Sequence, residues 1–263
     1  MNARFVVRGT LLSLTIVGLA VVAVLLINRG KQLPLEATPQ RPTITAPRGV
    51  MPTGPVGLTE WTKYGNDVYH AVGHGFLLRL ANGDLVGVTT AHSLSFSTLS
   101  PLEQIALAVS GEAKPAIEFD TLRGEPGTAR SGEDMTVDYV LLNAPKNAAI
   151  DPQLILAPDP RGLPQPGERV SIYTAVNNQP RVFEGTVQSA GDQAVWVLMD
   201  GAFDPSGMSG SPFVSQYTGR VIGMAIATTH RADKVLLGLH PIGSIVRKAE
   251  SASVFPKIAD YRR

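Results

Sequence analysis

Short apolar runs separated by turn-forming residues restrict the fold of this chain more than any other feature. From Pro55 onward, runs of roughly four to eight residues, the usual length of strands, alternate with Gly, Pro, Asn and Asp. The 263 residues include 26 glycines and 20 prolines, so chain reversals are frequent. Residues of this kind interrupt helices, and the pattern therefore predicts many short strands and tight turns rather than a helical bundle.

The predicted strands form two groups on either side of a Pro/Asp-rich stretch, residues 144–167. Ala81-Asn-Gly-Asp84 predicts a hairpin turn within the first group. The runs that predict strands are Gly75–Leu80, Leu85–Thr90, Tyr139–Leu142, Arg169–Tyr173, Ala194–Leu198, Pro212–Ser215, Arg220–Ile226 and Val235–Leu239. Only Ile242–Ala252 has a helical pattern, so we expect an all-β domain of two antiparallel units with a short C-terminal helix.

The N-terminal region predicts a membrane anchor, residues 1–31. Residues 9–27 carry no charge, and as a helix they would be about 28 Å long, close to the hydrocarbon thickness of a bilayer. A cleaved signal peptide is the alternative, but no small-residue cleavage site follows the apolar run. The positive-inside rule mildly favours a cytoplasmic N-terminus and an exported (periplasmic or extracellular) C-terminal domain.

Residues 32–55 predict an extended linker between the anchor and the domain. Six prolines between positions 34 and 55 disfavour helix and sheet interiors and favour polyproline II. The alternative is an arm that packs along the first β unit from Met51 onward.

Composition excludes several classes of site. The chain has no cysteine, which rules out disulfides, thiolate metal sites and a cysteine nucleophile. Its net charge of +1 gives no general reason to expect nucleic-acid binding. His70 and His74 have the spacing of helical zinc ligands, but a strand would hold them about 13 Å apart. We therefore expect no metal and no cofactor.

Three segments carry residue types suited to nucleophilic catalysis. Thr89-Thr-Ala-His-Ser93 ends a predicted strand with a histidine, and Asp138 begins the next one. Gly207-Met-Ser-Gly-Ser-Pro212 places Ser209 between glycines. Each residue alone also fits a structural role: a histidine at a strand end, a serine in a turn, or an aspartate capping a turn, with Asp134 competing for the same role as Asp138.

At these residues the chain resembles the trypsin-like (chymotrypsin-fold) serine proteases, in particular their compact, cysteine-free bacterial type. The order His92, Asp138, Ser209 is the order of that family, and the resemblance covers roughly residues 56–251. It implies a protease domain over residues 56–263 with two six-stranded antiparallel β-barrels, the first at about 56–145 and the second at about 160–240. It also implies a serine endopeptidase whose partner is a peptide or protein substrate.

The resemblance assigns a role to each residue. Ser209 would be the nucleophile, His92 the base that takes its proton, and Asp138 the acid that orients the imidazole. The amides of Gly207 and Ser209 would form the oxyanion hole. Met208 stands where trypsin has an aspartate that pairs with a newly cut N-terminus, so we expect activity without proteolytic processing.

The resemblance also suggests a substrate pocket. The residues that would line it are Phe203, Asp204, Ile226, Ala227 and Thr228. Phe203 would favour a closed or apolar pocket, whereas Asp204 pointing inward would favour Arg or Lys. Because Asp204-Pro205 more often starts a turn with its carboxylate on the backbone, we expect small or apolar substrate side chains. Two alternatives stay open: a catalytically inactive protease-fold module that binds peptides, and a hydrolase of small esters or amides.

Overall fold

The computed structural model describes residues 40–65, 68–94, 101–201, 204–231 and 234–261. The predicted anchor, residues 9–27, and the pocket residue Phe203 lie outside these ranges. Within them the chain is almost entirely β, with one α-helix, α2 (Ile242–Ser251), as the sequence predicts. None of the helices in these ranges is long and apolar enough to cross a membrane.

The N-terminal half of the described domain is an open, strongly curved sheet rather than the predicted six-stranded barrel. Its strands are β1 (Leu58–Tyr64), β2 (Tyr69–Arg79), β3 (Leu85–Thr89), β4 (Leu102–Ala108), β5 (Ile117–Phe119), β6 (Val140–Asn143) and β7 (Ile155–Leu156). They follow the order β5-β4-β1-β2-β3-β6, and β7 pairs with β2 in parallel. Strand β5 has only three residues. Beyond it, an isolated bridge between Leu122 and Leu142 links the chain to β6.

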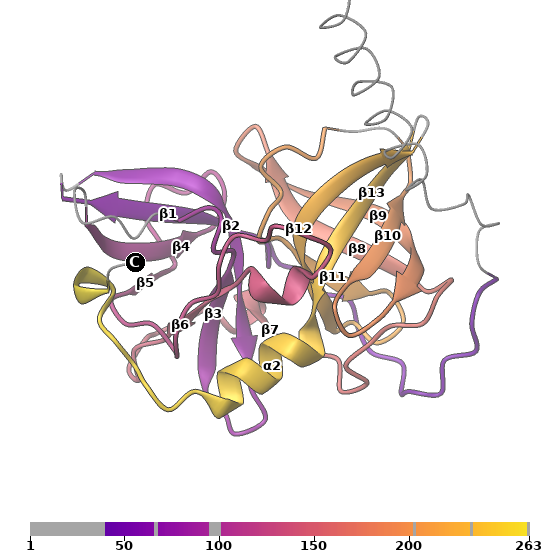
Figure 1. The fold of residues 1–263 in the computed structure, drawn as a ribbon, viewed down its shortest axis with the longest axis horizontal. Helices are drawn as coiled ribbons and strands as arrows, with labels where there is room; N and C mark the ends of the chain where they lie inside the picture. Colours follow the sequence, from indigo (N-terminus) through magenta and orange to yellow (C-terminus); the bar gives the residue numbers. More distant parts are fainter. Residues whose placement is uncertain (1–39, 66–67, 95–100, 202–203, 232–233, 262–263) are drawn as a thin grey trace, which may run out of the picture. The chain divides into compact units, whose positions relative to one another are not determined.

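The C-terminal half is a closed six-stranded barrel, as predicted (Figure 1). Its strands are β8 (Arg169–Val176), β9 (Gln179–Ala190), β10 (Val195–Met199), β11 (Pro212–Ser215), β12 (Val221–Arg231) and β13 (Lys234–Pro241). They close in the order β10-β13-β12-β11-β8-β9. Closure pairs the strand edges of this half, which gives the loop before β11, with Ser209, a rigid support.

Three apolar clusters hold the domain together. One fills the first sheet around Phe119 and Leu77, and another fills the second barrel around Phe213. The third joins the halves, with Phe76 of the first sheet and Met224 of the second barrel in one cluster. Helix α2 adds its buried apolar side chains to this third cluster and is the yellow helix in the lower middle of Figure 1. Burial of apolar area between the two halves fixes their relative position, on which a site made from both depends.

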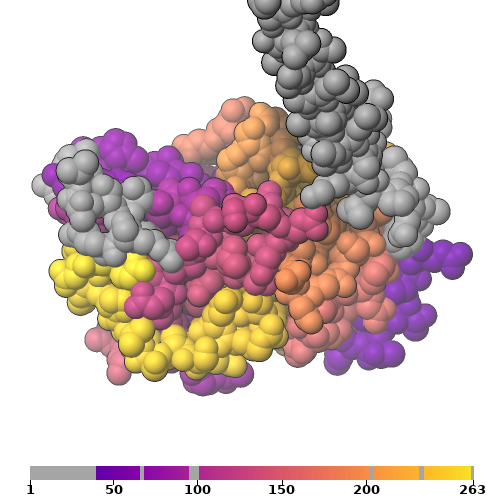
Figure 2. Space-filling model, in the orientation of Figure 1, coloured from indigo at the N-terminus to yellow at the C-terminus, as the bar shows by residue number. Residues whose placement is uncertain are grey.

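The described part of the proline-rich segment runs along the second barrel. The amide of Gly49 donates to the carbonyl of Tyr217, and the Tyr173 hydroxyl donates to the carbonyl of Pro52. Val56, at the start of the domain, is fully buried. Figure 2 shows this indigo segment against the orange second barrel.

Candidate active site

Asp138 sits at the centre of a dense set of hydrogen bonds. It follows a 3-10 helix, Met135–Val137, and is fully buried. Its Oδ1 accepts from the amides of Ala91 (2.8 Å) and His92 (3.1 Å). Its Oδ2 lies 2.8 Å from His92 Nδ1 and accepts from the amide of Arg130 at 3.3 Å.

These donors keep Asp138 ionised in spite of its burial. Burial by itself would raise the pKa of the carboxyl group, but the hydrogen bonds and charge of His92 and the two backbone amides outweigh it. The net effect holds the pKa of Asp138 below its usual value. An ionised carboxylate only accepts, so His92 Nδ1 carries the hydrogen of their shared bond.

His92 therefore presents its other nitrogen to the surface. The turn after β3 carries it, and its side chain is 33% exposed. With the hydrogen on Nδ1, the lone pair of Nε2 is free to accept a proton. This is the tautomer that a general base next to a serine requires.

The segment that carries Ser209 is a tight turn anchored in the second barrel. The Asp204 carboxylate accepts from the amide of Ser206, and the amide of Met208 donates to the carbonyl of Pro205. Gly207 has φ +77°, a conformation that favours glycine. The side chain of Met208 is buried in the barrel core, where it holds the loop by packing instead of by an ion pair.

His74 of β2 connects this loop to the first sheet. Its amide donates to the carbonyl of Ser209 (3.0 Å), and its Nδ1 lies 2.7 Å from the carbonyl of Gly207. Its Nε2 accepts from the amide of Ala175 at 3.1 Å. Burial lowers the pKa of His74, which is consistent with a neutral ring that donates from Nδ1. The sequence indicated His74 only as a zinc ligand to be dismissed, and nothing in its spacing pointed to this contact.

The loop of Ser209 and the turn of His92 lie next to each other above Gly73. A Cβ atom on Gly73 would be 3.5 Å from the Ser209 carbonyl and 3.6 Å from Ser93 Cβ. Among the described residues the Ser209 hydroxyl makes no hydrogen bond, and the amides of Gly207 and Ser209 donate none. Both amides are thus available as donors to a bound group, as an oxyanion hole requires.

Comparison with known proteins places this arrangement in a familiar fold. No family model and no curated protein matches the chain. Among solved structures, the Rv3671c protease in an inactive form is similar at 14% identity and a TM-score of 0.52, over 76% of this chain and 90% of that one. The thermostable serine protease AL20 from an extremophilic microorganism has 14% identity and a TM-score of 0.52, and the match covers 76% of this chain and 98% of AL20. The HtrA-type protease AlgW with a decapeptide has 14% sequence identity and a TM-score of 0.50, and the match covers 76% of this chain and 65% of AlgW. The chain has the trypsin-like serine protease fold.

Within this trypsin-like fold, Glu60 of β1 lies behind the His92 turn. Nothing in the sequence analysis indicated a role for it. It is fully buried, and its Oε2 accepts from the hydroxyls of Thr89 (2.7 Å) and Ser93 (2.9 Å). Its Oε1 is buried without a hydrogen bond from any described group. Burial raises the pKa of Glu60 to about 7, although the two hydroxyls and the charge of His92 lower it in part. The sequence feature that could have indicated Glu60 is the alternation of side chains along β1, which turns Leu58, Glu60 and Thr62 inward.

The raised pKa of Glu60 predicts a stability that decreases as pH rises. Between its ordinary value of 4.5 and about 7, the folded protein keeps a proton that the unfolded chain has released. The free energy of unfolding of the wild type, relative to Glu60→Gln, should therefore fall by about 2–3 kcal/mol from pH 5 to pH 8. Urea unfolding of both proteins at the two pH values measures this difference. An unchanged difference would show that Glu60 is ionised throughout.

The pocket residues of this protease fold lie in different surroundings. Asp204 is exposed and bound to the backbone of its own turn. Ile226 is 6% exposed and packs into the cluster between the halves, whereas Ala227 is partly buried and Thr228 exposed. Of the three predicted pocket residues on β12, Ile226 thus belongs to the core, and only Ala227 and Thr228 are accessible to a ligand.

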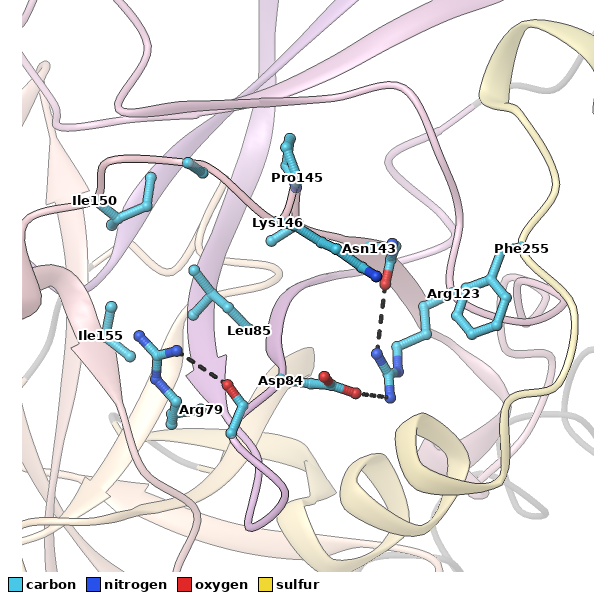
Figure 3. A pocket seen from close by; sticks show the side chains of 13 residues that line it. Arg79, Asp84, Leu85, Arg123, Asn143, Pro145, Lys146, Ile150, Ile155 and Phe255 are labelled. Atoms are coloured by element: carbon cyan, nitrogen blue, oxygen red, sulfur yellow. Dashed lines mark hydrogen bonds and ion pairs between the residues drawn. The ribbon is translucent and has the colours of Figure 1, made fainter.

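A separate hollow of about 590 Å³ lies at the other end of the first sheet of the protease fold (Figure 3). Arg79, Asp84 and Lys146 line it, together with Leu85 at the start of β3. His92 follows the opposite end of β3, so this hollow is not part of the candidate active site.

Proposed function

We propose that the protein is a serine endopeptidase that uses Ser209, His92 and Asp138. The observation that carries the proposal is the buried Asp138 carboxylate, which accepts four hydrogen bonds and directs the imidazole of His92 toward the surface. A structural carboxylate needs partners, but it does not need a histidine held with a free ring nitrogen at the surface. The similar solved structures support the fold on which this proposal depends.

The reaction follows from the positions of these groups. Nε2 of His92 takes the hydroxyl proton of Ser209 as Oγ bonds to the carbonyl carbon of the substrate. The resulting oxyanion accepts from the amides of Gly207 and Ser209, and each such donor contributes about 100- to 1000-fold in rate. The imidazolium, stabilised by Asp138, then protonates the leaving amine as the C–N bond breaks. Water then adds to the acyl carbon as His92 takes its proton. The bond from that carbon to Oγ breaks, and the proton passes to Oγ, which regenerates Ser209.

The turn around Gly207 supports the oxyanion hole. His74 binds the carbonyls of Gly207 and Ser209, which fixes the peptide groups 207–208 and 209–210 on either side of the one that carries the Ser209 amide. Gly207 itself has open space where a Cβ would be, so a substrate can approach closely.

The substrate preference we propose is for a small or apolar side chain before the scissile bond. The exposed Asp204 carboxylate is engaged by the Ser206 amide, and this leaves it unsuited to pair with a substrate Arg or Lys. Fluorogenic peptides that differ only in Ala, Leu or Lys at that position test the preference. Faster cleavage of the Lys peptide would contradict it.

We also propose that residues 9–27 tether this domain to a membrane on its exported side. The support is the uncharged run itself and its basic flanks. The full chain should sediment with membranes and resist carbonate extraction, and protease added to spheroplasts should digest it. A chain that stays in the soluble fraction, or that is protected in spheroplasts, would contradict this topology.

The first test is covalent labelling of the full chain with a fluorophosphonate. Wild-type protein should be labelled, and labelling should fall below detection in Ser209→Ala and by several orders of magnitude in His92→Ala. Ser206→Ala is the matched control, because it removes an exposed serine of the same turn and should label like the wild type.

The same samples separate the proposal from its alternatives. Folded wild-type protein that stays unlabelled would favour the peptide-binding module without turnover, since Ser209 makes no hydrogen bond to His92 in the described structure. Labelling without cleavage of any peptide would favour a hydrolase of small esters or amides.

A further inference from the structure

Glu60 is a buried acid that none of the catalytic steps above uses. It faces the catalytic turn from β1, where its register partners are Gly73 on β2 and Leu107 on β4. Its two hydrogen-bond partners are Thr89, at the end of β3, and Ser93, next to His92. An acid in a core position needs a reason, because burial of an unpaired charge is costly.

The Glu60 carboxylate and two backbone carbonyls compete for the hydrogens of the same two hydroxyl groups. Thr89 Oγ1 lies 2.7 Å from Glu60 Oε2 and 2.9 Å from the carbonyl of His74. Ser93 Oγ lies 2.9 Å from Glu60 Oε2 and 3.0 Å from the carbonyl of Thr90. Each hydroxyl has one hydrogen, so it serves either the carboxylate or the backbone carbonyl.

The charge of Glu60 therefore selects between two hydrogen-bond arrangements. When Glu60 is ionised, both hydroxyls donate to Oε2. When Glu60 is protonated, its own hydrogen enters the network, and the hydroxyls are free to donate to the carbonyls of His74 and Thr90. One carbonyl belongs to the residue that holds Ser209, and the other belongs to the turn that holds His92.

Few other charges act on this carboxyl group. On β2 the nearest titratable side chain is His74, whose ring points to Gly207 and Ala175 and is neutral. On β4 the facing residue is apolar. The charge of His92 acts on Glu60 directly, and Asp138 lies beyond His92. The negative charge of an ionised Glu60 would therefore attract a positive charge that forms on the His92 ring during catalysis.

We propose that Glu60 is a positioning residue of the active site, whose ionisation sets the hydrogen bonds of the His92 turn and stabilises the imidazolium formed during catalysis. This inference rests on the proposed function. Since burial raises the pKa of Glu60 to about 7, the contribution should appear as pH passes through neutrality. Below that pH the carboxyl group of Glu60 is neutral, and it then resembles the uncharged amide of a glutamine at the same position.

The test compares fluorophosphonate labelling rates of the full-length wild type and Glu60→Gln from pH 6 to pH 8.5. The ratio of wild-type to variant rate should be near one at pH 6 and rise to about 3- to 10-fold at pH 8, with its midpoint near 7. Glu112→Gln, which alters an exposed turn carboxyl, should give a ratio of one at every pH. A merely structural role would change the rate by the same factor at all pH values, and a flat or inverted ratio would overturn the inference.

A second variant keeps the test valid if Glu60→Gln does not fold. Ser93→Ala removes one hydroxyl that stabilises the charged form, so the pH-dependent step in labelling should move to higher pH. A step that stays in place would contradict the network.

A readout without turnover separates this inference from the proposed function. In ¹³C spectra of protein labelled at glutamate carboxyls, one signal absent from Glu60→Gln should titrate near pH 7 and shift its midpoint upward in Ser93→Ala. If the wild type is never labelled by fluorophosphonate but this signal behaves as described, the endopeptidase proposal fails and the coupling of Glu60 to the His92 turn stands. If labelling occurs and no such signal exists, only the role of Glu60 fails.

Discussion

Asp138→Asn should lower kcat for peptide hydrolysis about 10⁴-fold with little change in KM. In the native site, Oδ1 accepts from two backbone amides and Oδ2 faces His92 Nδ1 and the amide of Arg130. The asparagine oxygen can satisfy the two amides only if its NH₂ group takes the place of Oδ2. That group donates to His92 Nδ1, which forces the hydrogen of the ring onto Nε2. Nε2 of His92 then has no lone pair with which to take a proton.

Asp134→Asn is the matched control for this substitution. Asp134 precedes the same 3-10 helix and accepts from the amide and hydroxyl of Thr136, but it does not contact His92. It should keep kcat within about twofold of the wild type, because surface substitutions away from the reacting groups have small effects. Equal losses in both variants would show that the helix as a whole, rather than the Asp138 carboxylate, supports the activity.

Gly210→Ala should destabilise the protein by on the order of 4 kcal/mol or more, among the largest effects of a single substitution. Gly210 has φ +88°, and an added Cβ would lie 1.8 Å from the carbonyl oxygen of His74. Both the loop and β2 would have to move, although His74 binds Ser209 and Gly207 from the same strand. The variant should therefore lose fluorophosphonate labelling as well as stability. Thermal unfolding monitored by circular dichroism gives the measurement.

Gly207→Ala separates backbone strain from this collision. Gly207 has φ +77°, but no atom lies within 4 Å of its added Cβ. The substitution should cost only about 1–2 kcal/mol of left-handed strain. If the two variants lose similar stability, the close contact between Gly210 and β2 does not hold the loop as described.

The strands that the sequence predicted have a continuous apolar run, but β4 was missed although it contains the apolar run Ile105–Ala108. The strands β3, β11 and β13 and helix α2 were expected close to their observed bounds, whereas β2 begins at Tyr69, six residues before the predicted start at Gly75. Strand β9 was missed because it is largely exposed and has no apolar run. Strand β1 was missed because a glutamate occupies one of its inward positions.

The failure of the first half to close could not be read from the residues. Closure depends on the length and tilt of every strand in a sheet, which local pattern does not specify. Here β5 ends after three residues, and β7 joins from beyond β6 as a parallel partner of β2.

The candidate triad could be named from the sequence because His92 follows an apolar run, Asp138 precedes one, and Ser209 lies close to two glycines. The sequence alone thus determined the strand-rich fold and the residues His92, Asp138 and Ser209 as candidates. Only the tertiary structure decided which groups surround them: the four donors on Asp138, the contact of His74 with Gly207, and the buried Glu60 behind the His92 turn. Apart from the Arg130 amide, which lies eight residues from Asp138, these contacts join residues 29 to 133 positions apart in the sequence. Long-range pairing is set by the packing of the two halves, and no local pattern in the chain records it.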